Sequence, residues 1–314
     1  MGKILFKTLK LIRPKQWIKN FAIFAAIIFS GQLFEPNLVG EVILGFFAFC
    51  FASSAIYIVN DIFDVEKDKM HPFKRFRPLA HGDLSIEYAI VVTVILFIAS
   101  MIISNAINSG FVVLILIYCL MQLSYSMFLK NLTVTDILLL ATGYMIRVYG
   151  GEVATGFHIS VWLILTTVAL SLFLAVGKRK SELTLISQMP SHQIESIRKT
   201  LSHYSESLLN VYASIFATSA FIFYSLFTFL ENPQGIKIGF RLLLPDFLPP
   251  YLQRKWLMVT IIPVVYGLMR YLQDIYEKHE GESPEKVLLS DTPLLATVVL
   301  WAVLVVGIIY FLGE

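Results

Sequence analysis

The sequence predicts an all-α fold, a polytopic membrane bundle of about nine transmembrane helices. Hydrophobic residues make up 57% of the chain, charged residues make up 15%, and the mean hydropathy is +0.73. An ordinary soluble domain is only about 45–50% apolar and about 25% charged. The apolar residues lie in blocks of roughly 17 to 25, each able to cross a hydrocarbon core about 30 Å thick as a helix. Because such blocks and short connections account for nearly all 314 residues, we expect one membrane-embedded domain over residues 1–314.

The chain begins with a basic segment, residues 1–17. It is too weakly apolar to be a cleaved signal peptide, and no small-residue cleavage site follows it. Ile4, Leu5, Leu9 and Ile12 fall on one side of a helix, and lysines fall on the other. This pattern predicts an amphipathic segment that lies in the membrane interface.

Apolar blocks follow this segment, and hydropathy predicts a transmembrane helix for each of them. They cover residues 18–35, 40–60, 86–105, 110–128, 133–151, 158–177, 206–230, 256–275 and 293–312.

The distribution of Lys and Arg predicts the orientation of these spans. Both residues are plentiful in the N-terminal segment and in the connections 61–85 and 178–205, but absent from the first, third and fifth connections. Because positive charge collects on the cytoplasmic side, we expect a multi-pass plasma-membrane protein whose N-terminus and active-site loops 61–85 and 178–205 are cytoplasmic. One connection does not fit. Residues 231–255 are predicted to be external, although they contain Lys237, Arg241, Arg254 and Lys255.

Several classes of function find no support in the sequence. The net charge of +3 is small and gives no indication of nucleic-acid binding. Cys50 and Cys119 fall inside apolar blocks and are expected to be free thiols. The histidines have no zinc-ligand or haem-ligand spacing, and no nucleophile-elbow, Walker or Rossmann pattern is present.

An acidic run, Asn60-Asp61-Ile62-Phe63-Asp64-Val65-Glu66-Lys67-Asp68, follows the second apolar block. Asp61, Asp64 and Asp68 are three and four residues apart, so a continuing helix would place them on one face. Three like charges repel one another unless a cation lies among them, and carboxylates shared with substrate phosphates favour Mg²⁺. Asn60 would add an amide to the same site. The alternative is an ordinary solvated helix end.

A first basic motif, His71-Pro72-Phe73-Lys74-Arg75-Phe76-Arg77-Pro78-Leu79, follows the acidic run. Arginine binds phosphate through two parallel hydrogen bonds, and lysine contributes a compact charge. Lys74, Arg75 and Arg77 are therefore candidates for holding a polyphosphate on the side opposite the metal. These cations could instead anchor the loop to anionic lipid headgroups.

A second basic motif, Gly177-Lys178-Arg179-Lys180-Ser181-Glu182, ends the sixth block. Lys178 and Arg179 are candidate phosphate ligands, and Glu182 is a candidate metal or hydroxyl ligand. The same residues would also suit a simple stop signal at the membrane boundary.

Polar residues within the apolar blocks are further candidates. Because a charge at membrane depth is costly, Asp136 and Arg147 are expected to face the bundle interior or a wet cavity, although Asp136 could instead lie in the interface. Where the first block begins, Lys19 and Asn20 could point into the bundle at the level of the site. Trp17 is expected to be an interfacial anchor.

These motifs resemble those of a known group of membrane enzymes. A span that ends in N-D-x-x-D-x-x-x-D is similar to the UbiA prenyltransferase superfamily, whose helical enzymes use Mg²⁺ to activate a diphosphate. Other segments, spread over almost the whole chain, are similar to the decaprenyl-phosphate phosphoribosyltransferases. They are R-P-K-Q-W-I-K-N from Arg13, K-R-F-R-P from Lys74, Arg147 with Gly150-Gly151, G-K-R-K-S-E from Gly177 and P-E-K-V-L-L-S-D from Pro284.

The resemblance implies a pair of substrates. Ordinary superfamily members carry a second aspartate-rich motif after the sixth span, where this chain has its second basic motif. The family implies transfer of 5-phosphoribose from phosphoribosyl diphosphate to a polyprenyl phosphate, with release of pyrophosphate. It implies Mg²⁺ on Asp61, Asp64 and Asp68. The residues expected to complete the site are Lys74, Arg75 and Arg77 for catalysis and Lys19, Asn20, Asn60, Arg147, Lys178, Arg179 and Glu182 for substrate binding.

Two other functions remain as alternatives. A UbiA-type prenyltransferase would move a prenyl group from a prenyl diphosphate to an aromatic acceptor, and it shares the fold and the acidic run. A membrane transporter also places charges inside a helical bundle. The sequence leaves open the length of the lipid and whether the protein forms a homo-oligomer.

Overall fold

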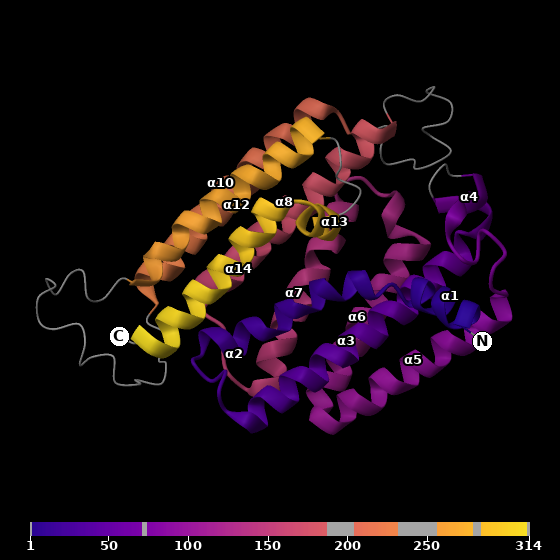
Figure 1. Ribbon diagram of the computed structural model, residues 1–314, viewed down its shortest axis with the longest axis horizontal. Helices are drawn as coiled ribbons and strands as arrows, with labels where there is room; N and C mark the ends of the chain where they lie inside the picture. Colours follow the sequence, from indigo (N-terminus) through magenta and orange to yellow (C-terminus); the bar gives the residue numbers. More distant parts are fainter. Residues whose placement is uncertain (1, 71–73, 187–203, 232–255, 279–283, 313–314) are drawn as a thin grey trace, which may run out of the picture.

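A computed structural model describes residues 2–70, 74–186, 204–231, 256–278 and 284–312 (Figure 1). Within these ranges the regular structure is helical. Three predicted features lie wholly or partly outside the described residues. They are positions 71–73 of the first basic motif, positions 187–203 of the connection after the sixth block, and positions 232–255, which contain the four cations that did not fit the orientation.

Long helices are joined by short 3₁₀ and π segments. In chain order the elements are α1 (Gly2–Ile12), η1 (Pro14–Phe24), α2 (Ala25–Phe29), α3 (Pro36–Phe63), α4 (Val65–Met70), η2 (Lys74–Phe76), α5 (Ile86–Ile107), α6 (Ser109–Met127), η3 (Leu129–Asn131), α7 (Thr135–Thr155), α8 (Val161–Ile186), α10 (Glu206–Leu230), η6 (Trp256–Thr260), α12 (Ile261–Gln273), η7 (Asp274–Lys278), α13 (Pro284–Ser290), α14 (Thr292–Gly307) and η8 (Ile308–Leu312).

Within the described ranges, 8 helices are long and apolar enough to cross a membrane. They coincide with the predicted blocks from the second to the ninth, and the predicted all-α membrane bundle is confirmed. Several helices begin at residues that cap them. Ser85, Asn108, Ser205 and Asp291 each accept a hydrogen bond from a backbone amide of the first turn. These starts are therefore set by local sequence.

The first predicted block, residues 18–35, does not form one regular α-helix. η1 is a 3₁₀-helix of 11 residues, and α2 adds only 5 residues of α-helix. Because a 3₁₀-helix rises about 2.0 Å per residue and an α-helix about 1.5 Å, the two together span roughly 30 Å. They pack closely against α7, since a Cβ at Gly151 would collide with the carbonyl oxygen of Ile23. The segment is thus long enough to cross the bilayer as a thin, extended helix.

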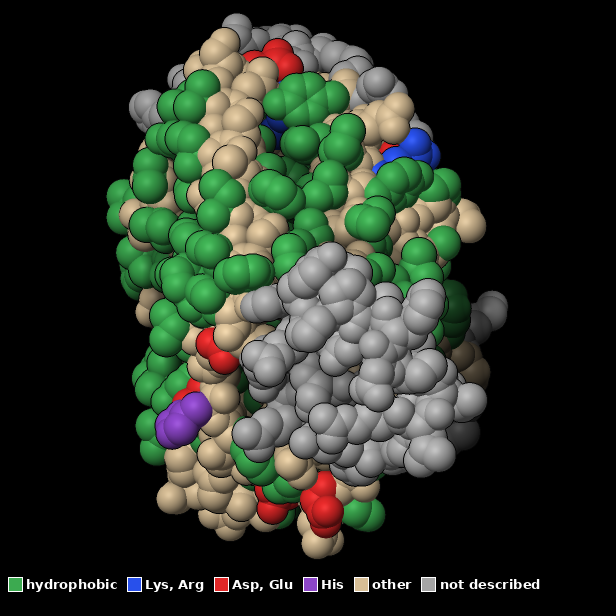
Figure 2. Space-filling model, turned by 90° about the vertical axis from the view of Figure 1, so that its left-hand side faces the viewer, with side chains coloured by type: hydrophobic (Ala, Val, Ile, Leu, Met, Phe, Trp, Pro, Cys, Tyr) green, Lys and Arg blue, Asp and Glu red, His purple; other side chains and the backbone are tan. Residues whose placement is uncertain are grey.

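The outer surface of the bundle is apolar. Figure 2 shows hydrophobic side chains covering most of the described part of one flank, with few charges among them. A contiguous apolar surface of this extent does not occur on a soluble monomer. It is the lipid-facing surface of a multi-pass membrane protein. On α5 the large exposed side chains include Ile86, Ile90, Val91, Val94, Ile95, Phe97, Ile98 and Ile102.

Two groups of helices flank α7 (Figure 1). On one side α3 packs against α5 and α6, and on the other α10 packs against α8 and α12, which packs against α14. α7 contacts η1, α3, α6 and α8, so it joins the two groups. Tyr310 of η8 ties the end of the chain to its first span, because its hydroxyl lies 3.0 Å from the Ile27 carbonyl and 2.9 Å from the Ile28 carbonyl.

Candidate active site

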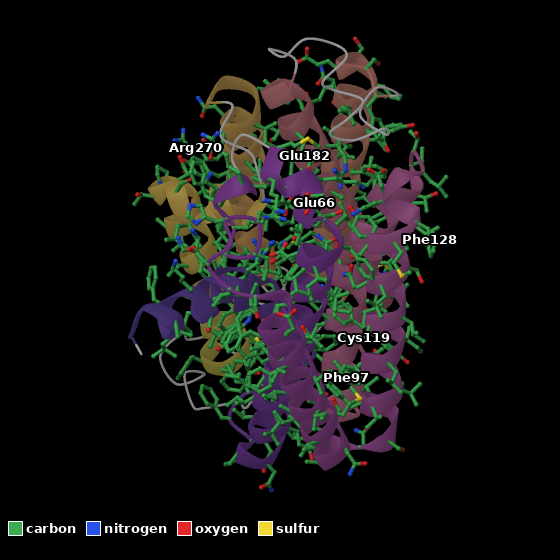
Figure 3. All side chains as sticks on the ribbon, turned by 90° about the vertical axis from the view of Figure 1, so that its right-hand side faces the viewer. Glu66, Phe97, Cys119, Phe128, Glu182 and Arg270 are labelled. Carbon is green, nitrogen blue, oxygen red and sulfur yellow. The ribbon has the colours of Figure 1, made fainter. Side chains whose placement is uncertain are left out.

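Charged side chains gather at one end of the bundle, which we call the charged end. Figure 3 shows nitrogen and oxygen atoms concentrated around the labelled Glu66 and Glu182, and mostly carbon around Phe97 and Cys119. The charged end contains the last turn of α3, the short elements α4, η2 and η3, and the last turns of α8. Ion pairs connect these elements.

The acidic run forms the last turn of α3 and the helix α4. Asp61 and Asp68 are 2% and 4% exposed, respectively. Arg77 Nη1 donates to Asp61 Oδ1 at 2.9 Å and to Asp68 Oδ2 at 2.6 Å. Arg13 Nη2 donates to both oxygens of Asp61, at 2.6 Å for Oδ2. Two buried carboxylates therefore converge on one guanidinium nitrogen.

Asp64 is held by a different cation. It follows the last residue of α3, with φ −98° and ψ 6°, and its amide donates to the carbonyl of the half-buried Asn60. Lys130 Nζ, from η3, donates to both Asp64 oxygens at 3.0 and 2.9 Å. Lys67 Nζ lies 4.0 Å away. The acidic run is thus divided between cations that come from distant parts of the chain.

The first basic motif contributes two of its three predicted cations to this end. Arg77 bridges the carboxylates, and the Lys74 ammonium lies among Arg77, Asp68 and Lys178. Arg75 is exposed, and its guanidinium stacks over the Phe76 ring at 4.9 Å. The structure does not bring Arg75 to the carboxylates.

The second basic motif is enclosed by protein. Arg179 is 0% exposed, and its Nε lies 2.9 Å from Asp136 Oδ2. The same guanidinium contacts Glu182 and, at 3.2 Å, the Tyr125 hydroxyl. Lys178 is only half-buried and interacts electrostatically with Glu182. Of the two predicted phosphate ligands, Lys178 is the more accessible one, whereas the Arg179 guanidinium is enclosed by protein.

η1 presents its polar side chains in rows. A 3₁₀-helix has three residues per turn, so side chains three apart are aligned. Lys19 Nζ donates to Gln16 Oε1 at 2.7 Å. In the adjacent row, Trp17 donates to a serine hydroxyl of α3 at 3.0 Å, and Asn20 and Ile23 are fully buried. Trp17, which we expected as an interfacial anchor, thus contributes to packing within the bundle.

Arg147 lies inside the bundle, as its position in the fifth block predicts. It is 3% exposed, and it donates to Asn20 Oδ1 at 2.6 Å, the Gly143 carbonyl at 2.5 Å and the Tyr118 hydroxyl at 2.8 Å. Its guanidinium also lies over the rings of Tyr118 and Tyr144. These partners are neutral, so the buried positive charge favours an anion near it.

The comparisons with known proteins agree with this architecture. A model described as the UbiA prenyltransferase family matches residues 20–290. The chain belongs to the UbiA prenyltransferase family.

Relatives of this UbiA-family chain include enzymes of one named activity. It is 32% identical to the decaprenyl-phosphate phosphoribosyltransferase of Corynebacterium glutamicum, over 97% of this chain and 87% of that protein. It is 33% identical to the protein of the same name from Mycolicibacterium smegmatis, over 96% of this chain and 92% of that protein.

A solved structure has the same fold. The UbiA homolog from Archaeoglobus fulgidus bound to GPP and Mg²⁺ superposes with a TM-score of 0.69 at 17% identity, covering 96% of this chain and 99% of that chain. This likeness establishes the UbiA fold for the described helices.

The donor set of the UbiA-family site fits a divalent cation that is shared with substrate. Among the residues that the structure describes, no three His, Cys, Asp or Glu side chains lie close enough to hold a metal by themselves. Mg²⁺ needs only one or two carboxylates when phosphates and waters complete its shell. Asp61 and Asp68 are such a pair. Burial raises the pKa of Asp68, and the nearby Asp61 charge adds to the rise while Arg77 opposes it, so a further cation would stabilise the ionised pair.

Sequence reasoning missed three residues of the charged end of this UbiA-family protein. Arg13 was noted only as part of a motif, yet it contacts Asp61. Lys130 is the lone charged residue between the fourth and fifth apolar blocks, and this position was the available signal. Tyr204, which donates to Asp136 at 2.7 Å, gave none, because tyrosine is common at the membrane interface.

Proposed function

We propose that the protein transfers 5-phosphoribose from phosphoribosyl diphosphate to a polyprenyl phosphate and releases pyrophosphate. The observation that carries the proposal is the pairing of a buried carboxylate pair, Asp61 and Asp68, with a surplus of cations from separate elements. Such a site suits two phosphorylated substrates. The name of the 31–33% identical relatives, decaprenyl-phosphate phosphoribosyltransferase, supports a polyprenyl phosphate acceptor and a transferred phosphoribosyl group.

The reaction requires positioning and charge neutralisation. The bond between ribose C1 and the diphosphate oxygen breaks, and a phosphate oxygen of the lipid forms a new bond to C1. The diphosphate leaves with the electron pair, and no proton has to move. A bound Mg²⁺ would supply charge stabilisation to the departing pyrophosphate. Asp61 and Asp68 would hold that ion, with Asp64 and Asn60 beside them.

The protein's own cations hold the phosphates in this proposal. Arg77 is 24% exposed and Arg13 is 23% exposed, so either guanidinium can exchange a carboxylate for a phosphate oxygen. Lys74, Lys178 and Lys19 contribute compact charges to the same space. Arg147 and Asn20 lie deeper in the bundle, where the uncompensated guanidinium favours an anionic group.

The second basic motif favours this reaction over prenyl transfer to an aromatic acceptor. A site that binds a prenyl diphosphate through two aspartate-rich motifs needs carboxylates at the end of α8. In this chain Glu182 is paired with Arg179, and Lys178 is available instead. A transporter is less well supported, because most ionisable side chains of the described residues gather at one end of the bundle.

The membrane placement belongs to the same proposal. We infer one domain over residues 1–314, with the N-terminus and the charged end in the cytoplasm of a plasma-membrane protein. α1 lies within the predicted interfacial segment 1–17, and its exposed side chains Ile4, Leu5 and Phe6 suit the headgroup boundary. Phosphoribosyl diphosphate would reach the site from the cytoplasm, and the polyprenyl phosphate from the bilayer.

A substrate panel tests the proposed function. Purified protein in detergent is incubated with labelled phosphoribosyl diphosphate and a short polyprenyl phosphate, with Mg²⁺ or with EDTA. A parallel sample contains a prenyl diphosphate and an aromatic acid. In the first sample we expect a labelled lipid and one equivalent of pyrophosphate when Mg²⁺ is present, and neither product in EDTA. Product from the prenyl diphosphate sample, with none from the first, would overturn the proposal.

A further inference from the structure

A strained turn lies between the acidic run and the second basic motif. Val134 has φ 68° and ψ −47°, and across it the Thr135 amide donates to the Thr133 carbonyl at 2.8 Å. This geometry is a γ-turn with positive φ, a rare and strained conformation. A β-branched residue at its centre adds to the strain. Such a turn persists only where surrounding groups hold it.

Tyr204 holds this turn. The Val134 amide donates to Tyr204 Oη at 2.7 Å, and the same hydroxyl donates to Asp136 Oδ1 at 2.7 Å. These roles are fixed, because an amide can only donate and an ionised carboxylate can only accept. Tyr204 is 4% exposed. Without the hydroxyl, the partly buried Val134 amide and the buried Asp136 carboxylate oxygen would each lose this partner.

Asp136 extends the link to α8. Its side chain is 0% exposed, and Asp136 Oδ2 lies 2.9 Å from Arg179 Nε. Arg179 in turn contacts Glu182. Burial and the hydrogen bond to Asp136 raise the pKa of Tyr204, so the phenol keeps its proton and remains a donor near neutral pH.

On its other side the turn is joined to the acidic run. Lys130 lies four residues before Val134 and donates to both oxygens of Asp64. A continuous set of contacts therefore runs from Asp64 through Lys130 and the turn to Tyr204, and onward through Asp136 to α8. The elements that carry these residues are far apart in the sequence, so local structure does not fix their separation.

We propose that Tyr204 is a positioning residue that fixes the distance between the acidic run and the second basic motif. The proposal rests on the proposed function, in which Asp61 and Asp68 of the acidic run hold the metal ion and Lys178 of the second basic motif contributes charge to the phosphate-binding space. Each part retains its own charges when the hydroxyl is removed, so each substrate still binds. Alignment of ribose C1 with the attacking phosphate oxygen is lost, and therefore kcat falls more than either KM rises.

A first measurement needs no substrate. Amide hydrogen exchange is compared between the wild type, Tyr204→Phe and the matched control Tyr224→Phe. Tyr224 lies on α10, the helix that begins two residues after Tyr204; it is 3% exposed and also makes two hydrogen bonds, with Thr260 at 2.6 Å and Trp301 at 2.8 Å. We expect faster exchange over residues 130–138 in Tyr204→Phe and not in the control. Unchanged exchange over 130–138 in Tyr204→Phe would overturn the proposal.

A second measurement separates positioning from folding. Turnover per folded molecule is measured with phosphoribosyl diphosphate and a short polyprenyl phosphate. Tyr204→Phe should lower kcat about tenfold or more and change each KM less than about threefold, while Tyr224→Phe keeps wild-type values. Adding Val134→Gly to Tyr204→Phe should restore part of kcat, because glycine adopts positive φ without strain.

Three results decide the outcome. An unchanged kcat in Tyr204→Phe, or an equal loss in Tyr224→Phe, overturns the positioning role. A wild type that transfers no phosphoribose defeats the proposed function. In that case the exchange measurement still decides whether Tyr204 holds the turn, so the two failures are distinguishable.

Discussion

The acidic run and the second basic motif are both clusters of mixed charge, but they are built in opposite ways. In the acidic run Asp61 and Asp68 are buried, and the cations that hold them, Arg13 and Arg77, are 23% and 24% exposed. In the second basic motif the cation itself is buried, since Arg179 and Asp136 are both 0% exposed. A partly exposed arginine can release its carboxylate for another anion, whereas an enclosed ion pair cannot do so without leaving a buried charge. The first cluster is suited to exchange partners, and the second is suited to hold a fixed shape.

The largest expected effect comes from removing a carboxylate of the first cluster. Asp61→Asn keeps the size of the side chain but removes the charge that both arginines contact. Turnover should fall at least about a hundredfold because the developing charge of the leaving group loses its stabilisation. The control is Glu66→Gln, an 82% exposed side chain on the same run that pairs with Lys69. Initial rates on folded protein check this, and near-wild-type rates for Asp61→Asn would disprove the assignment.

The first basic motif offers a sharper test, because it contains two arginines in different environments. Arg77→Ala removes the group shared by Asp61 and Asp68 and should lower turnover about tenfold or more. Arg75→Ala removes an exposed side chain stacked on Phe76 and should change turnover by less than about twofold. Initial rates at saturating substrate measure both variants. Equal losses of turnover in the two variants would contradict a specific role for the Arg77 contacts with Asp61 and Asp68.

A stability comparison examines the claim that the second cluster holds a fixed shape. Arg179→Met leaves Asp136 and Glu182 without their shared cation and should destabilise the protein by about 3–5 kcal/mol. Arg13→Met should have a smaller effect, because solvent reaches that ion pair. Thermal unfolding in one detergent, monitored by circular dichroism, compares the two. A larger loss for Arg13→Met would reverse the distinction between the clusters.

The smallest expected effect is a pH dependence that belongs to Asp68. Its pKa is raised by burial, so the folded state binds this proton more tightly than the unfolded state does. The corresponding stability is fully present at low pH and is lost as the pH rises through the raised pKa. In EDTA the Tm of the wild type should therefore fall between pH 4 and pH 7 by about 2 °C more than that of Asp68→Asn. Parallel curves for the two proteins would contradict a raised pKa.

The sequence was sufficient for most of the fold. Each long apolar block has few structures open to it in a bilayer, because backbone groups must pair within the segment. The capping residues Ser85, Asn108 and Asp291 also mark helix starts by local chemistry. The exception is η1. Its apolar content predicts an ordinary α-helix, but the structure has a thinner 3₁₀-helix there, which packs closely against Gly151 of α7. The spacing of Trp17, Asn20 and Ile23 by three was the signal available for it.

The candidate site was only partly predictable. Asp61 and Asp68 could be placed together because they are two helical turns apart on one segment. Two of the cations that pair with the acidic run could not be predicted, since Arg13 is 48 residues from Asp61 and Lys130 is 66 residues from Asp64. Such pairs form only through tertiary packing. The sequence did not indicate that Arg179 is enclosed, because a cation at a helix end is usually solvated and its partner Asp136 comes from another helix.

The period of η1 has a consequence for insertions and deletions. Lys19 and Gln16 form one row and Trp17, Asn20 and Ile23 another because the helix repeats every three residues. Removing one residue between Arg13 and Trp17 would rotate the side chains on one side of the gap by about 120° relative to those on the other. Either Arg13 would be turned away from Asp61 or Asn20 would be turned away from Arg147. Removing three residues would keep the remaining side chains on their original faces and shorten the helix by about 6 Å. The number of residues in this segment therefore sets the helical register that directs Arg13 and Asn20 to their partners.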